Sequence, residues 1–214
     1  MTGVSRTVTL CLVFVALVIG MFFYTKTRVP VLSEAELRER GVILLPRPRD
    51  IAPFELQNAA GGVFDKTNLE GRWSFVFFGF THCPDVCPTA LSVMGLAERA
   101  ILEGGMNEDA PFQGILVSVD PERDDAATLT RYVAGFSPRF LGVRGEREVL
   151  APFATQLNVA FAQVPDPSDP SAYQVDHTGN IVIINPRGHY HGFIRVPHKA
   201  DTLEVTYRSL SASF

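Results

Sequence analysis

Two cysteines placed close together are the residues of this 214-residue chain best suited to chemistry. Cys83 and Cys87 lie in the segment Thr81-His82-Cys83-Pro84-Asp85-Val86-Cys87-Pro88, with three residues between them. If the segment is helical, positions i and i+4 share a face and their Cβ atoms lie about 5–6 Å apart, so two thiolates can bind one metal ion. A disulfide needs about 3.5–4.5 Å between its Cβ atoms, so the pair can also close after a modest adjustment. Because thiolates are soft ligands, the spacing indicates a Cu(I) or Zn(II) site or a redox-active pair.

A metal site built on these two thiolates needs at least one more donor, and His177 is the best candidate. It lies in the segment 173–180, which we expect to form a loop just before a strand. A lone loop histidine is more often solvated or hydrogen-bonded than bound to a metal. His177 is therefore a candidate ligand only because the cysteine pair is also present. Asp176 can orient the His177 ring through a hydrogen bond, or it can equally cap the loop.

The other four histidines are weaker candidates. His82 directly precedes Cys83, but adjacent residues at a strand end often point apart, so we expect a structural or supporting role. His189 and His191 have strand spacing and can face one side, which permits a surface metal site, although exposed hairpin residues are the favoured interpretation. His198 has no partner that the sequence identifies.

The cysteine pair lies between a predicted strand and a predicted helix. Residues 73–80 are nearly all apolar, which predicts a central strand buried on both faces. Residues 88–103 place apolar side chains at helical spacing. Ligands bind at the carboxyl ends of strands in open α/β sheets, and the amides of a helix N-terminus lower the pKa of a nearby thiol. We therefore expect both thiols to be reactive.

The remaining predicted elements complete an α/β domain. Strands are expected over residues 114–119, 180–184 and 192–196, and helices over residues 124–136, 146–157 and 201–210. A β-α-β-α start followed by a hairpin and a helix predicts a thioredoxin-like fold over residues 51–214. The acidic segment 120–124 can contact a partner or cap the following helix, and its residues favour neither role.

The N-terminus predicts a single transmembrane helix. Residues 8–24 form an apolar run whose one clearly polar member is Thr9, near the short limit for crossing a bilayer. Bulky residues end the run where a signal peptidase needs small ones, so we expect an uncleaved anchor over residues 8–25. Cys11 lies early in the run and is interpreted as membrane-facing filler, not as a lipid attachment site. The flanking predictions are a short cytoplasmic head over residues 1–7 and a tether over residues 26–50.

Composition and charge exclude several classes of protein. The chain is 46% hydrophobic with 16 Phe, so it can build a core and is not mainly disordered. Three cysteines are too few for a disulfide scaffold. The net charge is −4, and the basic N-terminal end leaves the rest more acidic still, so no nucleic-acid binding is expected.

The charges that flank the apolar run bear on the orientation of the predicted anchor. Basic residues after the run favour a domain in the cytoplasm, although this positive-inside rule is weak for long domains.

Three motifs, in order along the chain, resemble the Sco/SenC family. They are FGFTHCPDVCPT at residues 78–89, VSVDPERD at residues 117–124 and YQVDHT at residues 173–178. Members of that family are membrane-tethered, thioredoxin-like proteins that bind copper and help assemble the CuA centre of cytochrome c oxidase. The resemblance extends from about Pro53 to the C-terminus. It implies that Cys83, Cys87 and His177 are ligands of copper, as Cu(I) or Cu(II).

The resemblance also implies a location and partners. The family carries one N-terminal anchor and places its copper domain in the periplasm or intermembrane space, which outweighs the charge count. The short head lacks a mitochondrial presequence, which favours a bacterial inner membrane with the domain in the periplasm. The implied partners are cytochrome c oxidase subunit II as acceptor, a copper donor protein and a thiol reductant. Two departures touch no proposed ligand: Asn185 stands where Asp is usual, and Thr178 where Ser is common.

The predicted function is therefore that of a copper chaperone rather than an enzyme, and three alternatives stay open. A thiol–disulfide oxidoreductase would use Cys83 as nucleophile and Cys87 as resolving thiol to reduce the cysteines of the same acceptor. A peroxidase would also activate a strand-end cysteine at a helix start. A non-catalytic binding module would hold the pair as a structural disulfide, which the placement at a helix start disfavours.

Overall fold

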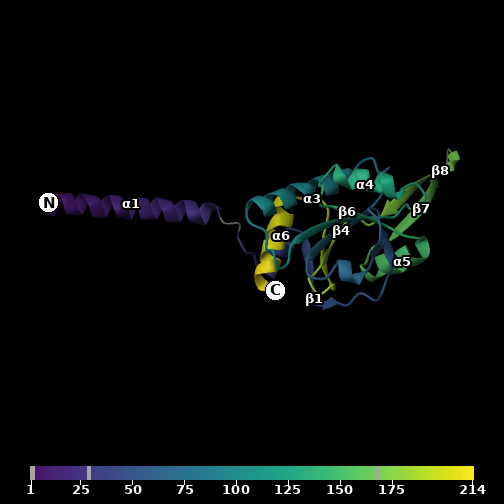
Figure 1. The fold of residues 1–214 in the computed structure, drawn as a ribbon, viewed down its shortest axis with the longest axis horizontal. Helices are drawn as coiled ribbons and strands as arrows, with labels where there is room; N and C mark the ends of the chain where they lie inside the picture. The colour runs from purple at the N-terminus through teal and green to yellow at the C-terminus, as the bar shows by residue number, and fades with distance from the viewer. Residues whose placement is uncertain (1–2, 28–29, 167–168) are drawn as a thin grey trace. The chain divides into compact units, whose positions relative to one another are not determined.

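The computed structural model describes residues 3–27, 30–166 and 169–214, and the chain divides into two compact units (Figure 1). One unit is Met1–Val31 and the other is Leu32–Phe214. The three proposed ligands, Cys83, Cys87 and His177, all belong to the second unit.

The first unit contains helix α1 (Gly3–Thr27), so the apolar run is helical as predicted. Within the described residues, no helix meets the length and apolarity needed to cross a bilayer. The anchor over residues 8–25 therefore stays a prediction. Residues 1–2 of the predicted head and residues 28–29 of the predicted tether lie outside the described residues.

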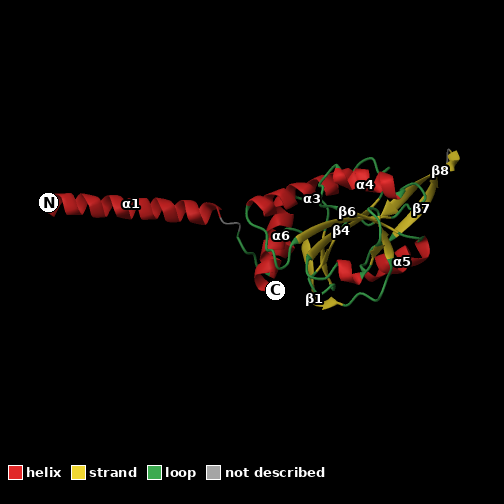
Figure 2. Ribbon diagram, in the orientation of Figure 1, coloured by secondary structure: helices red, strands yellow, loops and turns green. Residues whose placement is uncertain are grey.

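An eight-stranded mixed sheet forms the centre of the second unit, as far as the structure describes the chain (Figure 2). Its order is β1-β10-β9-β4-β5-β6-β2-β3. The strands are β1 (Val42–Arg49), β2 (Leu56–Asn58), β3 (Val63–Phe64), β4 (Trp73–Gly79), β5 (Phe112–Ser118), β6 (Leu141–Arg144), β9 (Ile181–Ile184) and β10 (Tyr190–Ile194). Strands β4, β5 and β6 are parallel, whereas β9 and β10 run antiparallel to their neighbours. This arrangement confirms the predicted α/β, thioredoxin-like layout.

Helices cover both faces of this sheet. Figure 2 shows α3 and α4 above the strands and α5 below them, while α6 packs beside α3. The helices are α2 (Glu34–Glu39), α3 (Val86–Glu103), α4 (Ala126–Ala134), α5 (Arg147–Gln156) and α6 (Ala200–Ser213), with a short 3₁₀ turn over Lys66–Asn68. Because both faces are covered, every residue of β4 and β5 is buried, as the continuous apolar run of β4 predicted.

The compact unit begins earlier than the sequence indicated. Residues 32–50, expected to form most of a tether, instead contribute α2 and the edge strand β1, which pairs with β10. Pro46 and Pro48 fit there because an edge strand tolerates a missing backbone N–H, and the pairing is irregular between Leu44 and Arg49.

A second departure concerns the segment that carries His177. Strands β7 (Phe161–Asp166) and β8 (Asp169–His177) form a two-stranded antiparallel sheet, where the sequence predicted a loop. His177 is the last residue of β8 and lies opposite Phe161. The histidine is thus held by a strand and not by an irregular loop.

Candidate metal centre

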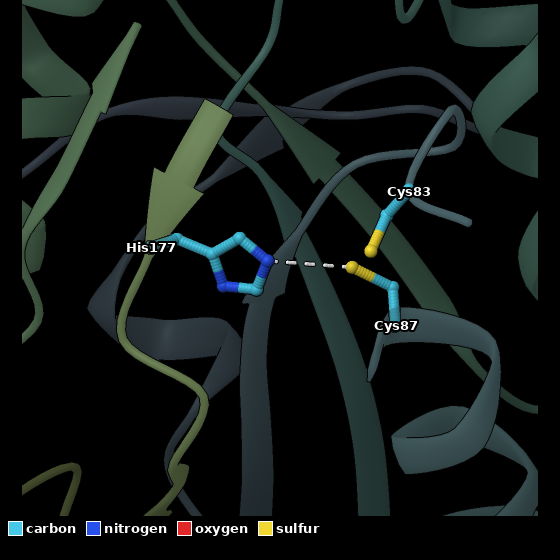
Figure 3. Close-up of side chains that lie close together, drawn as sticks. All are labelled: Cys83, Cys87 and His177. Carbon is cyan, nitrogen blue, oxygen red and sulfur yellow. Dashed lines mark hydrogen bonds between the residues drawn. The ribbon is translucent and has the colours of Figure 1, made fainter. Parts of the chain in front are cut away.

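Cys83, Cys87 and His177 come together at the carboxyl end of β4, as the sequence predicted (Figure 3). One potential ligand atom from each residue lies within 4.8 Å of the other two. The His177 ring points from the end of β8 toward the two sulfurs, and its Nε2 lies 3.5 Å from the Cys87 Sγ. Within the described residues, this is the one cluster of His, Cys, Asp or Glu donors with a spacing suited to a metal ion.

The two cysteines are held by different local structures. Cys83 lies in the turn between β4 and α3, where its backbone N–H donates to the Phe80 carbonyl at 3.3 Å. Cys87 lies in the first turn of α3, which begins at Val86. The pair is therefore not placed at i and i+4 of one helix, and the turn brings Cys83 back toward Cys87 instead. Both carry free thiols.

Gly79, the last residue of β4, lets the Cys87 sulfur approach the sheet. A Cβ atom at this position would lie 2.8 Å from the Cys87 Sγ and 2.9 Å from the Phe77 ring. Real Cβ atoms essentially never make contacts under 3.0 Å, so any side chain larger than hydrogen must displace the sulfur or the ring. Gly79 thus fixes the position of one proposed ligand, a role that the local sequence pattern does not reveal.

His177 is presented in the form that a metal needs. Its Nδ1–H donates to the Thr178 carbonyl at 3.3 Å, so the lone pair of Nε2 faces the cysteines. Burial lowers the pKa of His177, which keeps the imidazole neutral near pH 7. The rings of Phe77 and Phe80 meet the imidazole edge-on, with centroid distances of 5.7 and 5.9 Å. Asp176, proposed to orient the ring, is exposed, and the Thr178 carbonyl takes that role.

The electrostatics of Cys87 differ from the sequence-based expectation. Its side chain is fully buried, and this burial raises the pKa of the Cys87 thiol, with a further contribution from a hydrogen bond to Cys83. The expected lowering of the thiol pKa by the helix N-terminus is therefore wrong for Cys87, because loss of hydration outweighs the helix amides. A soft cation that replaces the thiol proton would compensate the buried negative charge.

The acidic segment 120–124 is an internal support of the site. Asp120 and Asp124 are fully buried, and Asp124 accepts hydrogen bonds from the Thr81 backbone N–H at 3.1 Å and from the Ser118 hydroxyl at 2.6 Å. The cap of α4 is Asp125, whose side chain accepts from the Thr128 N–H at 2.7 Å. The two buried carboxylates are therefore available neither to a partner nor as the helix cap.

The remaining histidines do not belong to this cluster. His82 is exposed and its Nδ1 lies 3.7 Å from Asp124, which fits the supporting role predicted for it. His189 pairs with Asp50 at 3.6 Å, whereas His191 packs edge-on against Trp73 with centroids 5.1 Å apart. These different partners argue against a shared surface metal site.

His198 has a partner that the sequence did not reveal. Its Nε2–H donates to the Gly179 carbonyl at 2.8 Å, two residues after His177. The ring also meets Phe77 edge-on at 6.3 Å, on the same phenylalanine that contacts the His177 imidazole. His198 therefore holds the chain that follows β8, a role that depends on tertiary contacts and leaves no local sequence signal.

Taken chemically, the cluster offers two sulfurs and one nitrogen. Soft thiolates with an imidazole suit Cu(I), Zn(II) or, with an added ligand, Cu(II). The same two thiols lie close enough to exchange with a disulfide partner. The donor set thus fits a transition metal and also permits redox chemistry.

Comparisons with known proteins identify the family. The SCO1/SenC family model matches residues 45–211. A Stutzerimonas stutzeri protein, provisionally named as copper-binding, is 36% identical over 170 residues, covering 79% of this chain and 81% of that protein. The mitochondrial SCO2 homologue of Bos taurus is 34% identical over 162 residues, covering 75% of this chain but only 59% of that protein.

One solved structure is similar to the chain in both sequence and fold. The crystal structure of Arabidopsis thaliana ScoI with copper bound superposes with a TM-score of 0.67 at 30% identity, covering 76% of this chain and 98% of that one. The family model begins within β1 and ends within α6, and it therefore includes all three clustered residues. The chain therefore belongs to the SCO1/SenC family.

Proposed function

We propose that this protein is a copper chaperone whose cargo is bound by Cys83, Cys87 and His177. The observation that carries the proposal is the convergence of the three donor atoms within 4.8 Å at the carboxyl end of β4. The copper-bound relative supports copper over zinc as the metal.

The three donors suit transfer of copper as well as binding. Two thiolates and one imidazole hold Cu(I) in low coordination, and an open position allows an acceptor ligand to enter before a protein ligand leaves. Two-electron oxidation of Cys83 and Cys87 to a disulfide consumes both sulfur ligands, so copper loading requires the reduced pair. A thiol reductant must therefore act before a copper donor protein can load the site.

The acceptor and the location follow from the family resemblance. We propose cytochrome c oxidase subunit II as the acceptor, at its CuA centre, and a bacterial inner membrane as the location. The apolar run of residues 8–24 supports a membrane tether with the copper domain in the periplasm. A periplasm-active reporter fused to the C-terminus should be active, and deletion of residues 1–25 should release the protein from the membrane fraction. Activity of a cytoplasmic reporter at that position would contradict the location.

A second candidate function is thiol–disulfide exchange with the cysteines of the same acceptor. The observation that favours it is the unequal burial of the pair, since Cys83 is 9% exposed and Cys87 is 0% exposed. The more accessible thiol suits a nucleophile and the buried one a resolving thiol.

One titration separates the two functions. The reduced full-length protein in detergent is titrated with Cu(I) in competition with a chromogenic chelator, beside His177→Ala and, as a matched control, His189→Ala. Copper affinity should fall roughly 10-fold or more in His177→Ala and stay unchanged in His189→Ala. Equal affinity in all three proteins would overturn the copper site. Rapid reduction of a model disulfide at the same rate in His177→Ala as in the wild type would favour the oxidoreductase.

A further inference from the structure

The motif at residues 117–124 forms a buried polar frame. The Ser118 hydroxyl donates to the Asp124 carboxylate at 2.6 Å and accepts from the Asp120 backbone N–H at 3.2 Å. All three side chains are fully buried. Buried carboxylates are costly unless they are fully hydrogen-bonded, so the contacts they make outside this segment indicate what the frame holds.

One arm of the frame reaches the cysteine turn. Asp124 accepts from both the backbone N–H and the hydroxyl of Thr81, at 3.1 and 2.5 Å. Thr81 lies two residues before Cys83, at the start of the turn that brings the cysteines together. This arm therefore sets the position of the sulfur side of the site.

The other arm reaches strand β8. The Tyr173 hydroxyl donates to Asp120 at 2.8 Å, and the Arg123 side chain forms an ion pair with the other oxygen of the same carboxylate. Arg123 also donates to the Tyr173 carbonyl at 3.3 Å, and its guanidinium lies 4.1 Å from the Tyr173 ring centroid. Burial and the bond to Asp120 raise the pKa of Tyr173 to about 12, so its hydroxyl stays a donor.

Tyr173 and His177 lie on the same face of β8, because side chains at i and i+4 of a strand point the same way. The strands β7 and β8 form their own sheet, and no ladder to the main sheet is found within the described residues. Hydrogen bonds of the main sheet therefore do not fix this hairpin. A further contact connects Arg123 to the metal cluster through Phe80. The Arg123 guanidinium lies 5.6 Å from the centroid of the Phe80 ring, and this ring meets the His177 ring edge-on.

We propose that Tyr173, Arg123 and Asp120 form a latch that positions the His177 hairpin against the cysteine turn and thereby sets the copper affinity. The proposal rests on the copper site proposed above. Within the described residues, no hydrogen bond, ion pair or ring contact joins any of the three to Cys83, Cys87 or His177, so they are positioning residues. Loosening the latch leaves the ligands present but lets the imidazole move away from the sulfurs.

The test compares two tyrosine-to-phenylalanine variants of the full-length protein. Tyr173→Phe removes only the hydroxyl bond to Asp120. Tyr207→Phe is the matched control, because the Tyr207 hydroxyl is bonded to the backbone of Asn107 and Ala110 and makes no contact with the latch. Each is titrated with Cu(I), its Cu(II) form is recorded by electron paramagnetic resonance, and its unfolding is followed in denaturant.

Copper affinity should fall about 10-fold in Tyr173→Phe, with an altered Cu(II) spectrum, and stay unchanged in Tyr207→Phe. Arg123→Lys keeps the charge but loses the planar guanidinium, so it should shift affinity in the same direction and gives a second variant. Wild-type affinity and spectrum in both latch variants, or equal losses in Tyr173→Phe and Tyr207→Phe, would overturn the latch. If His177→Ala itself binds copper normally, the copper site fails, and the latch fails with it.

Discussion

The Nε2 of His177 lies 3.5 Å from the sulfur of Cys87, although the two residues are 90 positions apart in the chain. The cysteines are local to one strand–helix junction, so the third donor depends on the hairpin β7–β8 and its packing. A site built this way gains one ligand only when the domain is folded. Residues that hold the hairpin against the cysteine turn should therefore affect copper affinity as strongly as many residues that contact the metal directly.

Gly79→Ala should weaken copper binding without unfolding the protein. The added methyl group would lie 2.8 Å from the Cys87 sulfur, so the sulfur must shift from its place opposite His177. We expect a loss of Cu(I) affinity of roughly 10-fold or more, measured by chelator competition.

Gly142→Ala is the control for this substitution. Its methyl group would lie 2.7 Å from the side chain of Leu129, an equally tight contact away from the cysteines. It should lower the free energy of unfolding while leaving copper affinity near that of the wild type. Equal copper affinity in Gly79→Ala and the wild type would show that the glycine does not set the sulfur position.

Cys83 should react with alkylating agents long before Cys87. Cys83 is 9% exposed and Cys87 is 0% exposed, and burial raises the pKa of Cys87, so its thiolate is scarce at neutral pH. The Cys87 thiolate fraction should rise about tenfold per pH unit, so its labelling should accelerate as pH increases. Mass spectrometry of the apo protein after brief iodoacetamide treatment measures both rates, and faster labelling of Cys87 would contradict the structure.

The apo protein should lose stability as the pH falls below about 6.5. Burial lowers the pKa of His177, His191 and His198, so the unfolded chain binds protons that the folded state does not. The free energy of unfolding is therefore highest above the unfolded pKa. It decreases as the pH falls, by at most about 1.4 kcal/mol per pH unit for each histidine. Urea unfolding at pH 7.5 and 5.5 measures this loss of unfolding free energy, and the loss should be smaller in His191→Gln. A loss as large in that variant as in the wild type would show that His191 does not contribute.

Asp124→Ala should destabilise the domain by about 3 kcal/mol, because it removes the acceptor of the buried Ser118 hydroxyl and of the half-buried Thr81 N–H and hydroxyl. Asp125→Ala, which removes an exposed helix cap, provides the neighbouring comparison and should cost less. Denaturant unfolding of both variants checks the order, and a larger loss in Asp125→Ala would contradict the internal role of Asp124.

The parts of the fold with strong periodicity could be predicted from sequence alone. The buried strand β4 and the apolar stripe of α3 carry their own patterns, so the position of the cysteine pair followed directly. The third proposed ligand, His177, followed from the presence of the cysteine pair and from the family resemblance of its motif, and neither requires knowing which strand carries the histidine.

The missed features depend on tertiary contacts. The hairpin carries Pro165, Pro170 and several Asp, which weaken any strand pattern, so β8 looked like a loop. Pro46 and Pro48 likewise hid the edge strand β1. The raised pKa of Cys87 arises from burial in the folded domain, which outweighs the local effect of the helix N-terminus.

X-ray absorption at the copper edge of the Cu(I)-loaded protein tests the central claim most directly, because it counts the atoms bound to the metal. The wild type should show two sulfur scatterers and one nitrogen scatterer of imidazole type, and His177→Ala should lose the nitrogen while keeping both sulfurs. A first shell without sulfur, or an unchanged imidazole signal in His177→Ala, would contradict the assignment of Cys83, Cys87 and His177 as the copper ligands.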